Sequence, residues 1–221
     1  MQLSDFENSI SSLAVITTIL QFLSGVLVCK QYVANRTTAE ASSLPFVFGL
    51  ICSSIWFLYG LFKHDNILIL VNTIGITSMI SYTIIFYLYT FKKSAVLKQI
   101  FGTVVFVIFL LCYVCTEDDK AVLFGTLGIM ACSFTILTIA APMSKLLHVL
   151  RVKSTECLPF PMILMSFFVS SLWFLYGVIK DDNFLWVPNL VGAGLAVTQL
   201  SLFVIYPNKS QSPSLIKNIV A

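Results

Sequence analysis

Two tryptophan–asparagine pairs are the residues of this sequence best suited to bind a ligand. Trp56 precedes Asn72 by 16 residues (72 − 56), and Trp173 precedes Asn189 by the same distance. Each pair lies in apolar sequence, where an amide is costly unless it is hydrogen-bonded or faces a cavity. An indole offers an apolar, electron-rich face, and an amide offers donors and an acceptor to hydroxyl groups. Together the pairs predict a site for a neutral, polyhydroxylated solute.

A purely structural role is the alternative for both residue types. The tryptophans could serve helix packing, and the asparagines could link neighbouring helices by hydrogen bonds. A shared site is favoured because each tryptophan and its asparagine lie about two helical turns from the same polar loop. They therefore reach a similar depth, and the two pairs occupy equivalent places in the chain.

These pairs belong to a longer internal repeat. The pentapeptide WFLYG occurs at Trp56–Gly60 and again at Trp173–Gly177, 117 positions apart (173 − 56). Asp65 and Asp182, each followed by asparagine, keep this offset, and LPF precedes both pentapeptides. The repeat predicts two structurally equivalent halves, each contributing one pair to the site.

The composition indicates that the surroundings of these residues are lipid. Of the 221 residues, 58% are hydrophobic and only 10% are charged, against about a quarter charged in soluble globular proteins. Apolar stretches of about 20 residues predict membrane-spanning helices. Seven such stretches are present: Ser9–Cys29, Ser43–Phe62, Ile67–Phe91, Gln99–Cys115, Val122–Leu147, Phe160–Ile179 and Phe184–Tyr206. The expected fold is an all-α membrane protein with seven transmembrane helices.

The repeat divides these helices as 3+1+3. We predict a three-helix repeat over residues 1–91, a loop and linker helix over 92–120, a second repeat over 121–207, and a short tail over 208–221. Three helices reverse the direction of the chain, so one added helix lets both copies cross the membrane the same way. The two triple-helix bundles are then parallel and related by a pseudo-twofold axis along the membrane normal, as in transporters whose site lies at the repeat interface.

Basic residues predict the orientation of these helices. With the N-terminus outside, only Lys63, Lys120 and Lys180 lie on the outer side, which leaves 10 of 13 lysines and arginines (13 − 3) in cytoplasmic segments. Such an excess marks the cytoplasmic side. We therefore expect an extracellular or lumenal N-terminus and a cytoplasmic C-terminus. The expected location is the plasma membrane, with the Golgi membrane as the alternative.

Polar residues near the outer loops could close the site from outside. Tyr59 and Tyr176 lie one turn beyond the tryptophans, and Asp65 and Asp182 follow in the loops. Hydrogen bonds among these four side chains would form an outer gate.

Prolines suggest where an inner gate would hinge. Pro45 and Pro159 lie at the cytoplasmic starts of their helices, where proline can also serve simply as a favourable first-turn residue. Pro142 lies within the span Val122–Leu147, where it removes a backbone hydrogen bond and should kink the helix.

Residue types missing from the spans narrow the function further. All carboxylates and both histidines, His64 and His148, lie in loops or at helix ends, whereas proton-coupled transporters generally place an ionisable residue within the membrane. This favours facilitated diffusion over proton symport. Since no nucleotide-binding loop, metal-ligand cluster or nucleophile–base pair is visible, we expect no enzyme activity, cofactor, metal site or nucleic-acid partner.

With these motifs the chain resembles the SWEET family of sugar facilitators, of the short-tailed animal kind. The resemblance covers nearly the whole chain and also includes KST at 153–155 and PN at 188–189. It implies a bidirectional uniporter of mono- or disaccharides that works by alternating access, with two bundles rocking about a central site. A neutral sugar and the lipid bilayer are the implied partners, and a homo-oligomer is an open alternative to a monomer.

The resemblance also implies roles for single residues. Cys52 and Val169, one turn before the tryptophans, match positions linked to substrate size, and their moderate volumes favour glucose-like monosaccharides. Gly25 stands in the first helix where the family has a fourth hinge proline, equivalent to Pro142. Glycine loosens a helix without forcing a kink, which argues against a symmetric four-proline inner gate. The family's sugar-binding positions are matched by Trp56, Asn72, Trp173 and Asn189.

Other protein classes share parts of this pattern. A PQ-loop-type transporter of another small solute, such as a lysosomal amino-acid exporter, predicts a Pro-Gln pair and an acidic residue in the membrane, and the sequence has neither. A seven-helix receptor fits the topology but not a three-helix repeat, and it would signal without solute flux. A membrane scaffold would be expected to carry charged groove residues.

Overall fold

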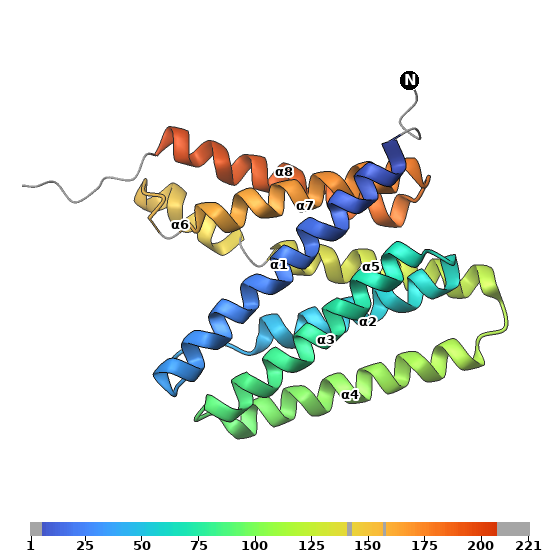
Figure 1. The fold of residues 1–221 in the computed structure, drawn as a ribbon, viewed down its shortest axis with the longest axis horizontal. Helices are drawn as coiled ribbons and strands as arrows, with labels where there is room; N and C mark the ends of the chain where they lie inside the picture. The colour runs from blue at the N-terminus through green and yellow to red at the C-terminus, as the bar shows by residue number, and fades with distance from the viewer. Residues whose placement is uncertain (1–5, 141–142, 157, 207–221) are drawn as a thin grey trace, which may run out of the picture.

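The structure, a computed structural model, describes residues 6–140, 143–156 and 158–206. Among them, seven helices are long and apolar enough to cross a membrane, and one, α6, is short. The predicted tail over 208–221 lies outside the described residues. The helices, labelled in Figure 1, are α1 (Glu7–Asn35), α2 (Leu44–Lys63), α3 (Asn66–Tyr89), α4 (Lys93–Thr116), α5 (Lys120–Ala140), α6 (Met143–Val152), α7 (Phe160–Ile179) and α8 (Asn183–Ile205).

The prediction of one continuous helix over Val122–Leu147 is wrong. α5 ends at Ala140, and a separate helix, α6, begins at Met143. Pro142, expected to act as a hinge, lies outside the described residues. The physical reason for two helices is that proline lacks the N–H of a helix interior and disfavours helical geometry at the residue before it.

The packing of the helices follows the repeat. In the first half α3 packs against both α1 and α2, and in the second half α8 packs against both α5 and α7. Between the halves, α1 packs against α7 and α2 packs against α5, while the linker α4 packs against α2. Each contact within or between the halves thus has its counterpart in the other half. The predicted 3+1+3 arrangement with a pseudo-twofold axis is confirmed.

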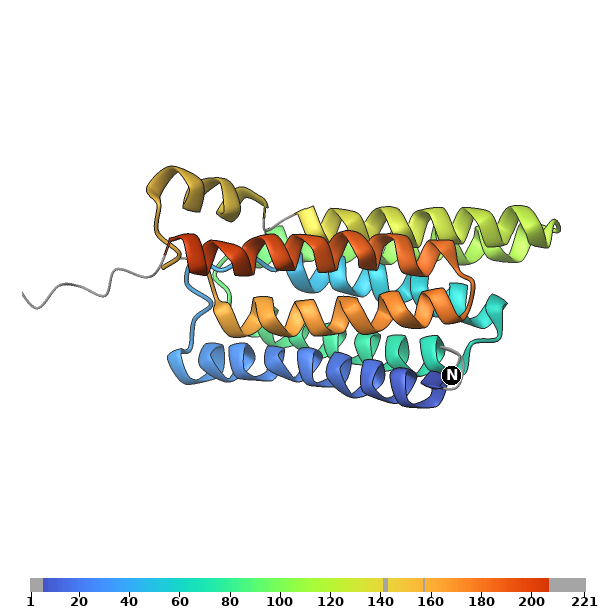
Figure 2. The same cartoon turned by 90° about the horizontal axis from the view of Figure 1, so that it is seen from above.

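The long helices run alongside one another along a common axis (Figure 2). One end of the molecule carries the start of α1 and the turns α2–α3, α4–α5 and α7–α8, and we call it the outer end after the predicted topology. The two bundles lie close together at this outer end and diverge toward the opposite, inner end (Figure 1).

The helix surfaces match a bilayer rather than water. One face of α1 exposes large apolar side chains that are between 49% and 65% accessible: Leu13, Ile16, Leu20, Leu23 and Leu27. Monomeric soluble proteins rarely expose so continuous an apolar face. With seven helices of spanning length, this chain is an integral, multi-pass membrane protein.

Gly25 allows close packing of α3 on α1. α1 runs without interruption through this residue, and a Cβ atom there would lie 2.5 Å from Cε2 of Tyr82 on α3. The Tyr82 hydroxyl donates a hydrogen bond to the Phe22 carbonyl at 2.8 Å. The first repeat has one uninterrupted helix where the second repeat has α5 and α6.

Candidate functional site

Both tryptophans of the predicted site lie between the two repeats, and each binds a threonine of the other repeat. Trp56 Nε1 donates to Thr135 Oγ1 at 2.9 Å, and Trp173 Nε1 donates to Thr18 Oγ1 at 2.9 Å. Both tryptophans are buried, at 7% exposed. The two threonines are themselves 117 positions apart (135 − 18), so the repeat relates one contact to the other.

The threonines have fixed hydrogen-bonding roles. Thr18 donates its hydroxyl proton to the Ala14 carbonyl at 2.7 Å, and Thr135 donates to the Ala131 carbonyl at 2.9 Å. A hydroxyl has only one proton, so its lone pairs remain to accept the indole N–H. Sequence reasoning missed both threonines, although the offset of 117 and their place in apolar helices were available signals.

The two asparagines make the same contact in both repeats. Asn72 Nδ2 donates to the Leu68 carbonyl and Asn189 Nδ2 donates to the Leu185 carbonyl, both at 2.8 Å. Asn72 is buried and Asn189 is half-buried. Within the described ranges, the structure shows no bond between the two amides. Each keeps its Oδ1 and a second N–H proton for a ligand.

The residues one turn before the tryptophans differ chemically. Cys52 Sγ lies 3.7 Å from Thr135 Oγ1, so Cys52 and Trp56 contact the same threonine hydroxyl. Its counterpart Val169 is buried and carries no polar atom. The site is therefore pseudo-symmetric in its indoles and amides but not at these two positions.

Two tyrosine–aspartate pairs join the repeats nearer the outer end, and the pairs cross over. Tyr59 donates its hydroxyl to both carboxylate oxygens of Asp182 at 2.9 Å. Tyr176 donates to those of Asp65 at 3.0 and 2.9 Å. Each tyrosine thus binds the aspartate of the other repeat.

The same aspartates also hold the starts of helices. Asp65 Oδ1 accepts the backbone N–H of Ile67 and of Leu68 at the start of α3, at 3.0 and 3.1 Å. Asp182 Oδ1 accepts the backbone N–H of Leu185 at the start of α8, and the Asp182 carboxylate also forms a salt bridge with Lys63. Each carboxylate therefore fastens the third helix of one repeat to the second helix of the other.

The inner end has a different character. Across the described part of the chain, side-chain hydrogen bonds between the two repeats run from Cys52 outward. Pro45 is the second residue of α2, Pro159 immediately precedes α7, and both are exposed. The two bundles diverge toward this end (Figure 1). The repeats are therefore hydrogen-bonded to each other near the outer end and lie apart at the inner end.

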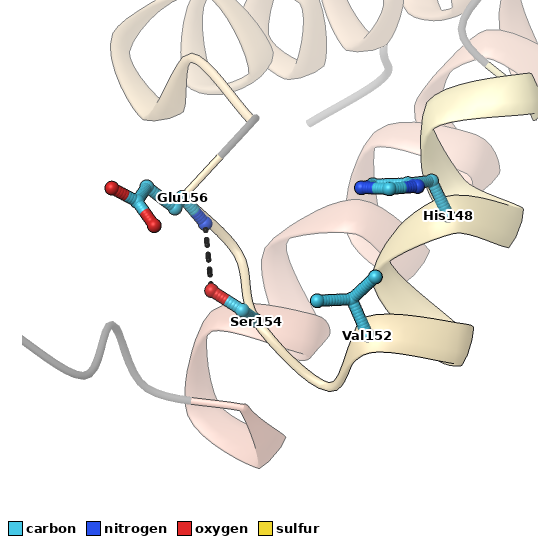
Figure 3. Close-up of a pocket in the computed structure, with 4 residues that line it drawn as sticks. All are labelled: His148, Val152, Ser154 and Glu156. Atoms are coloured by element: carbon cyan, nitrogen blue, oxygen red, sulfur yellow. Dashed lines mark hydrogen bonds between the residues drawn. The ribbon is translucent and has the colours of Figure 1, made fainter.

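A pocket at the inner end does not belong to this site. It measures about 240 Å³ and is lined by His148 and Val152 of α6 and by Ser154 and Glu156 of the following turn. The His148 ring projects toward that turn, whereas the Glu156 carboxylate points away from it (Figure 3). The Ser154 hydroxyl already accepts the Glu156 backbone N–H at 3.4 Å. These side chains do not converge on a ligand.

The internal repeat and the 3+1+3 packing agree with comparisons to known proteins. A family model described as "Sugar efflux transporter for intercellular exchange" matches residues 8–94 and again residues 125–211, two segments that start 117 positions apart (125 − 8). The chain belongs to this family, the SWEET family. This SWEET chain is 40% identical over 206 residues to "Sugar transporter SWEET1" of Drosophila pseudoobscura pseudoobscura, a match that covers 92% of the chain and 91% of the relative.

More distant members of the SWEET family match over similar lengths. "Bidirectional sugar transporter SWEET2" of Arabidopsis thaliana is 29% identical over 197 residues, covering 86% of this chain and 82% of the relative. A solved structure of a eukaryotic SWEET transporter superimposes with a TM-score of 0.85 at 24% identity. That superposition covers 93% of this SWEET chain and 99% of the other, so the two share one fold.

Proposed function

We propose that this SWEET chain is a bidirectional uniporter of neutral mono- or disaccharides, with glucose-like sugars as the preferred class. The observation that carries the proposal is the repeat-related pair of tryptophan–threonine contacts, with an asparagine of matching depth in each repeat. Relatives that are named sugar transporters support it.

The central site would bind a sugar by stacking and hydrogen bonding. The faces of Trp56 and Trp173 would pack against C–H groups of the ring, and the free amide atoms of Asn72 and Asn189 would bind its hydroxyls. Cys52 and Val169 would limit the size of the sugar that fits. A neutral set of side chains suits a solute without charge, since no ion must be desolvated on binding.

Alternating access would follow from opening the two ends in turn. The crossed pairs Tyr59–Asp182 and Tyr176–Asp65 would form the outer gate. Both pairs are hydrogen-bonded here, so such a gate would be closed in this arrangement. Hinges at the inner end would involve Pro45, Pro142 and Pro159. Gly25 takes the place in α1 that is equivalent to Pro142, and α1 continues through it as one helix. We place the N-terminus outside and the C-terminus in the cytoplasm of a plasma-membrane protein, and we leave a homo-oligomer open.

Sugar flux in liposomes tests this function. Purified protein in liposomes should carry labelled glucose in either direction down its gradient, at the same rate with or without a pH gradient. Flux that requires an inward proton gradient would contradict the uniport mechanism. A sugar-dependent signal to a cytoplasmic protein without any flux would favour a receptor instead.

Thr135→Val should raise the KM for sugar about two- to tenfold in the same assay. Valine keeps the shape of threonine but removes the acceptor that fixes the Trp56 indole, and one hydrogen bond contributes about 0.5–1.5 kcal/mol. Thr73→Val is a matched control, because this exposed hydroxyl bonds to the Ile69 carbonyl of its own helix. A lower Vmax with an unchanged KM would show that Thr135 does not position the binding ring.

A further inference from the structure

A pocket of about 370 Å³ opens at the outer end, between the two repeats, beside the Tyr176–Asp65 pair. α1 contributes Glu7 and Ser11 to its lining, and α7 contributes Tyr176; Lys180 follows α7 directly. The volume lies within the range of about 300–1,000 Å³ for small-molecule sites. The pocket is thus large enough for a small solute and lies directly on one of the crossed pairs.

The equivalent place in the other repeat is filled. Positions 7, 11 and 67 correspond, with the offset of 117, to Phe124, Gly128 and Phe184. The Tyr59 ring stacks on Phe124 with centroids 4.8 Å apart, and Phe184 packs edge-on against both rings at 6.2 and 6.1 Å. A Cβ atom at Gly128 would lie 2.4 Å from the Phe184 ring. Aromatic rings therefore occupy the space that is open on the first side.

The two equivalent lysines also bind different partners. Lys63 forms its salt bridge with Asp182, a member of a crossed pair. Lys180 binds Glu7 instead, because α1 offers a carboxylate where α5 has Phe124. The Glu7 and Lys180 side chains are 38% and 33% exposed. Both keep unused hydrogen-bonding capacity toward the pocket, since an ammonium has three donors and a carboxylate about four acceptor sites.

We propose that this pocket is a second, outer binding site for the transported sugar, and that the twofold repeat provides only one such site. The inference rests on the proposed function. Hydroxyl groups of a hexose would bind the Glu7 carboxylate, the Lys180 ammonium and the Ser11 hydroxyl, with the Asn66 amide at the rim. A sugar bound here touches the wall formed by Tyr176 and Asp65, the pair that must separate to admit it to the central site.

Glucose titration of the full-length protein in lipid nanodiscs, observed by saturation-transfer NMR, tests the outer site. In an Asn189→Ala variant, whose central site is disabled, we expect residual glucose binding. Adding Ile67→Phe, which introduces the residue of the filled side, should weaken this binding at least about tenfold. Glu7→Gln keeps the side-chain volume and should weaken it about three- to tenfold, which serves as a second variant if the phenylalanine disturbs folding. Glu40→Gln is the control, because it breaks the exposed Lys92–Glu40 salt bridge at the inner end.

The outcomes separate the two proposals. Loss of all glucose binding in Asn189→Ala, while the wild type carries sugar in liposomes, would overturn the outer site alone. Residual binding that survives both Ile67→Phe and Glu7→Gln would do the same. A wild-type protein without flux and without glucose binding would remove the transport function together with the outer site. Residual binding that is lost in both pocket variants and kept in Glu40→Gln supports the outer site.

Discussion

Asn189→Ala should lower glucose flux in liposomes at least about 100-fold, to near the background of protein-free vesicles. The variant would lose the second N–H donor and the acceptor oxygen that Asn189 offers to sugar hydroxyls in a site away from bulk water. Each hydrogen bond that is lost there costs about 1–1.5 kcal/mol, so the loss of three costs about 3–4.5 kcal/mol, which exceeds a factor of 100. Alanine is the best helix former, and the Leu185 carbonyl bound by Asn189 stays within α8, so the helix should remain intact.

The control for this variant lies on the same helix. Asn183 begins α8, and its Oδ1 accepts the indole N–H of Trp186 at 2.9 Å, an exposed contact within the first turn of the helix. Asn183→Ala should leave flux within about twofold of the wild type, and thermal melting in detergent should show that both variants are folded. Full activity in Asn189→Ala would remove this residue from the binding site.

The fold was largely predictable because both the helices and the repeat leave patterns in the sequence. Apolar runs of spanning length give the seven helices, and an offset of 117 between identical motifs gives the two bundles. The bounds of the fifth span, Val122–Leu147, were wrong because the apolar run continues past Ala140, and Pro142 was expected to kink one helix rather than to separate two. A proline inside an apolar run can end a helix as well as kink it, and the sequence alone does not decide between the two.

Hydrogen bonds among the tyrosines and aspartates near the outer end were predictable, but which tyrosine binds which aspartate was not. Tyr59, Tyr176, Asp65 and Asp182 follow from their places next to the outer loops, and the structure joins them by hydrogen bonds. Each tyrosine binds the aspartate of the other repeat because of the way the two bundles pack. No local sequence pattern predicts that packing. Their action as a gate stays a prediction. Thr18 was missed because threonines in apolar helices usually bond to their own backbone, as it also does.

Asp182→Ala should shift the resting protein from closed to open at the outer end. This carboxylate accepts hydrogen bonds from Tyr59 and Lys63, and both contacts are lost together. A hydrogen bond to a charged group contributes about 1.5–3 kcal/mol, so the loss of even one of these contacts should raise the ratio of open to closed protein at least about tenfold. Native Cys52 reports the change in a variant whose other cysteines are serine. A membrane-impermeant thiol reagent added outside should modify it at least about tenfold faster.

Helix capping must be separated from gating, because Asp182 also accepts the backbone N–H of Leu185 at the start of α8. Tyr59→Phe removes only the hydroxyl and leaves the cap, so it should reproduce part of the faster Cys52 modification. Asp118→Ala, which removes an exposed carboxylate from the α4–α5 turn, should leave the rate unchanged. If Asp182→Ala accelerates the modification but Tyr59→Phe does not, the start of α8 or the Lys63 salt bridge, and not the Tyr59 hydroxyl, keeps the outer end closed.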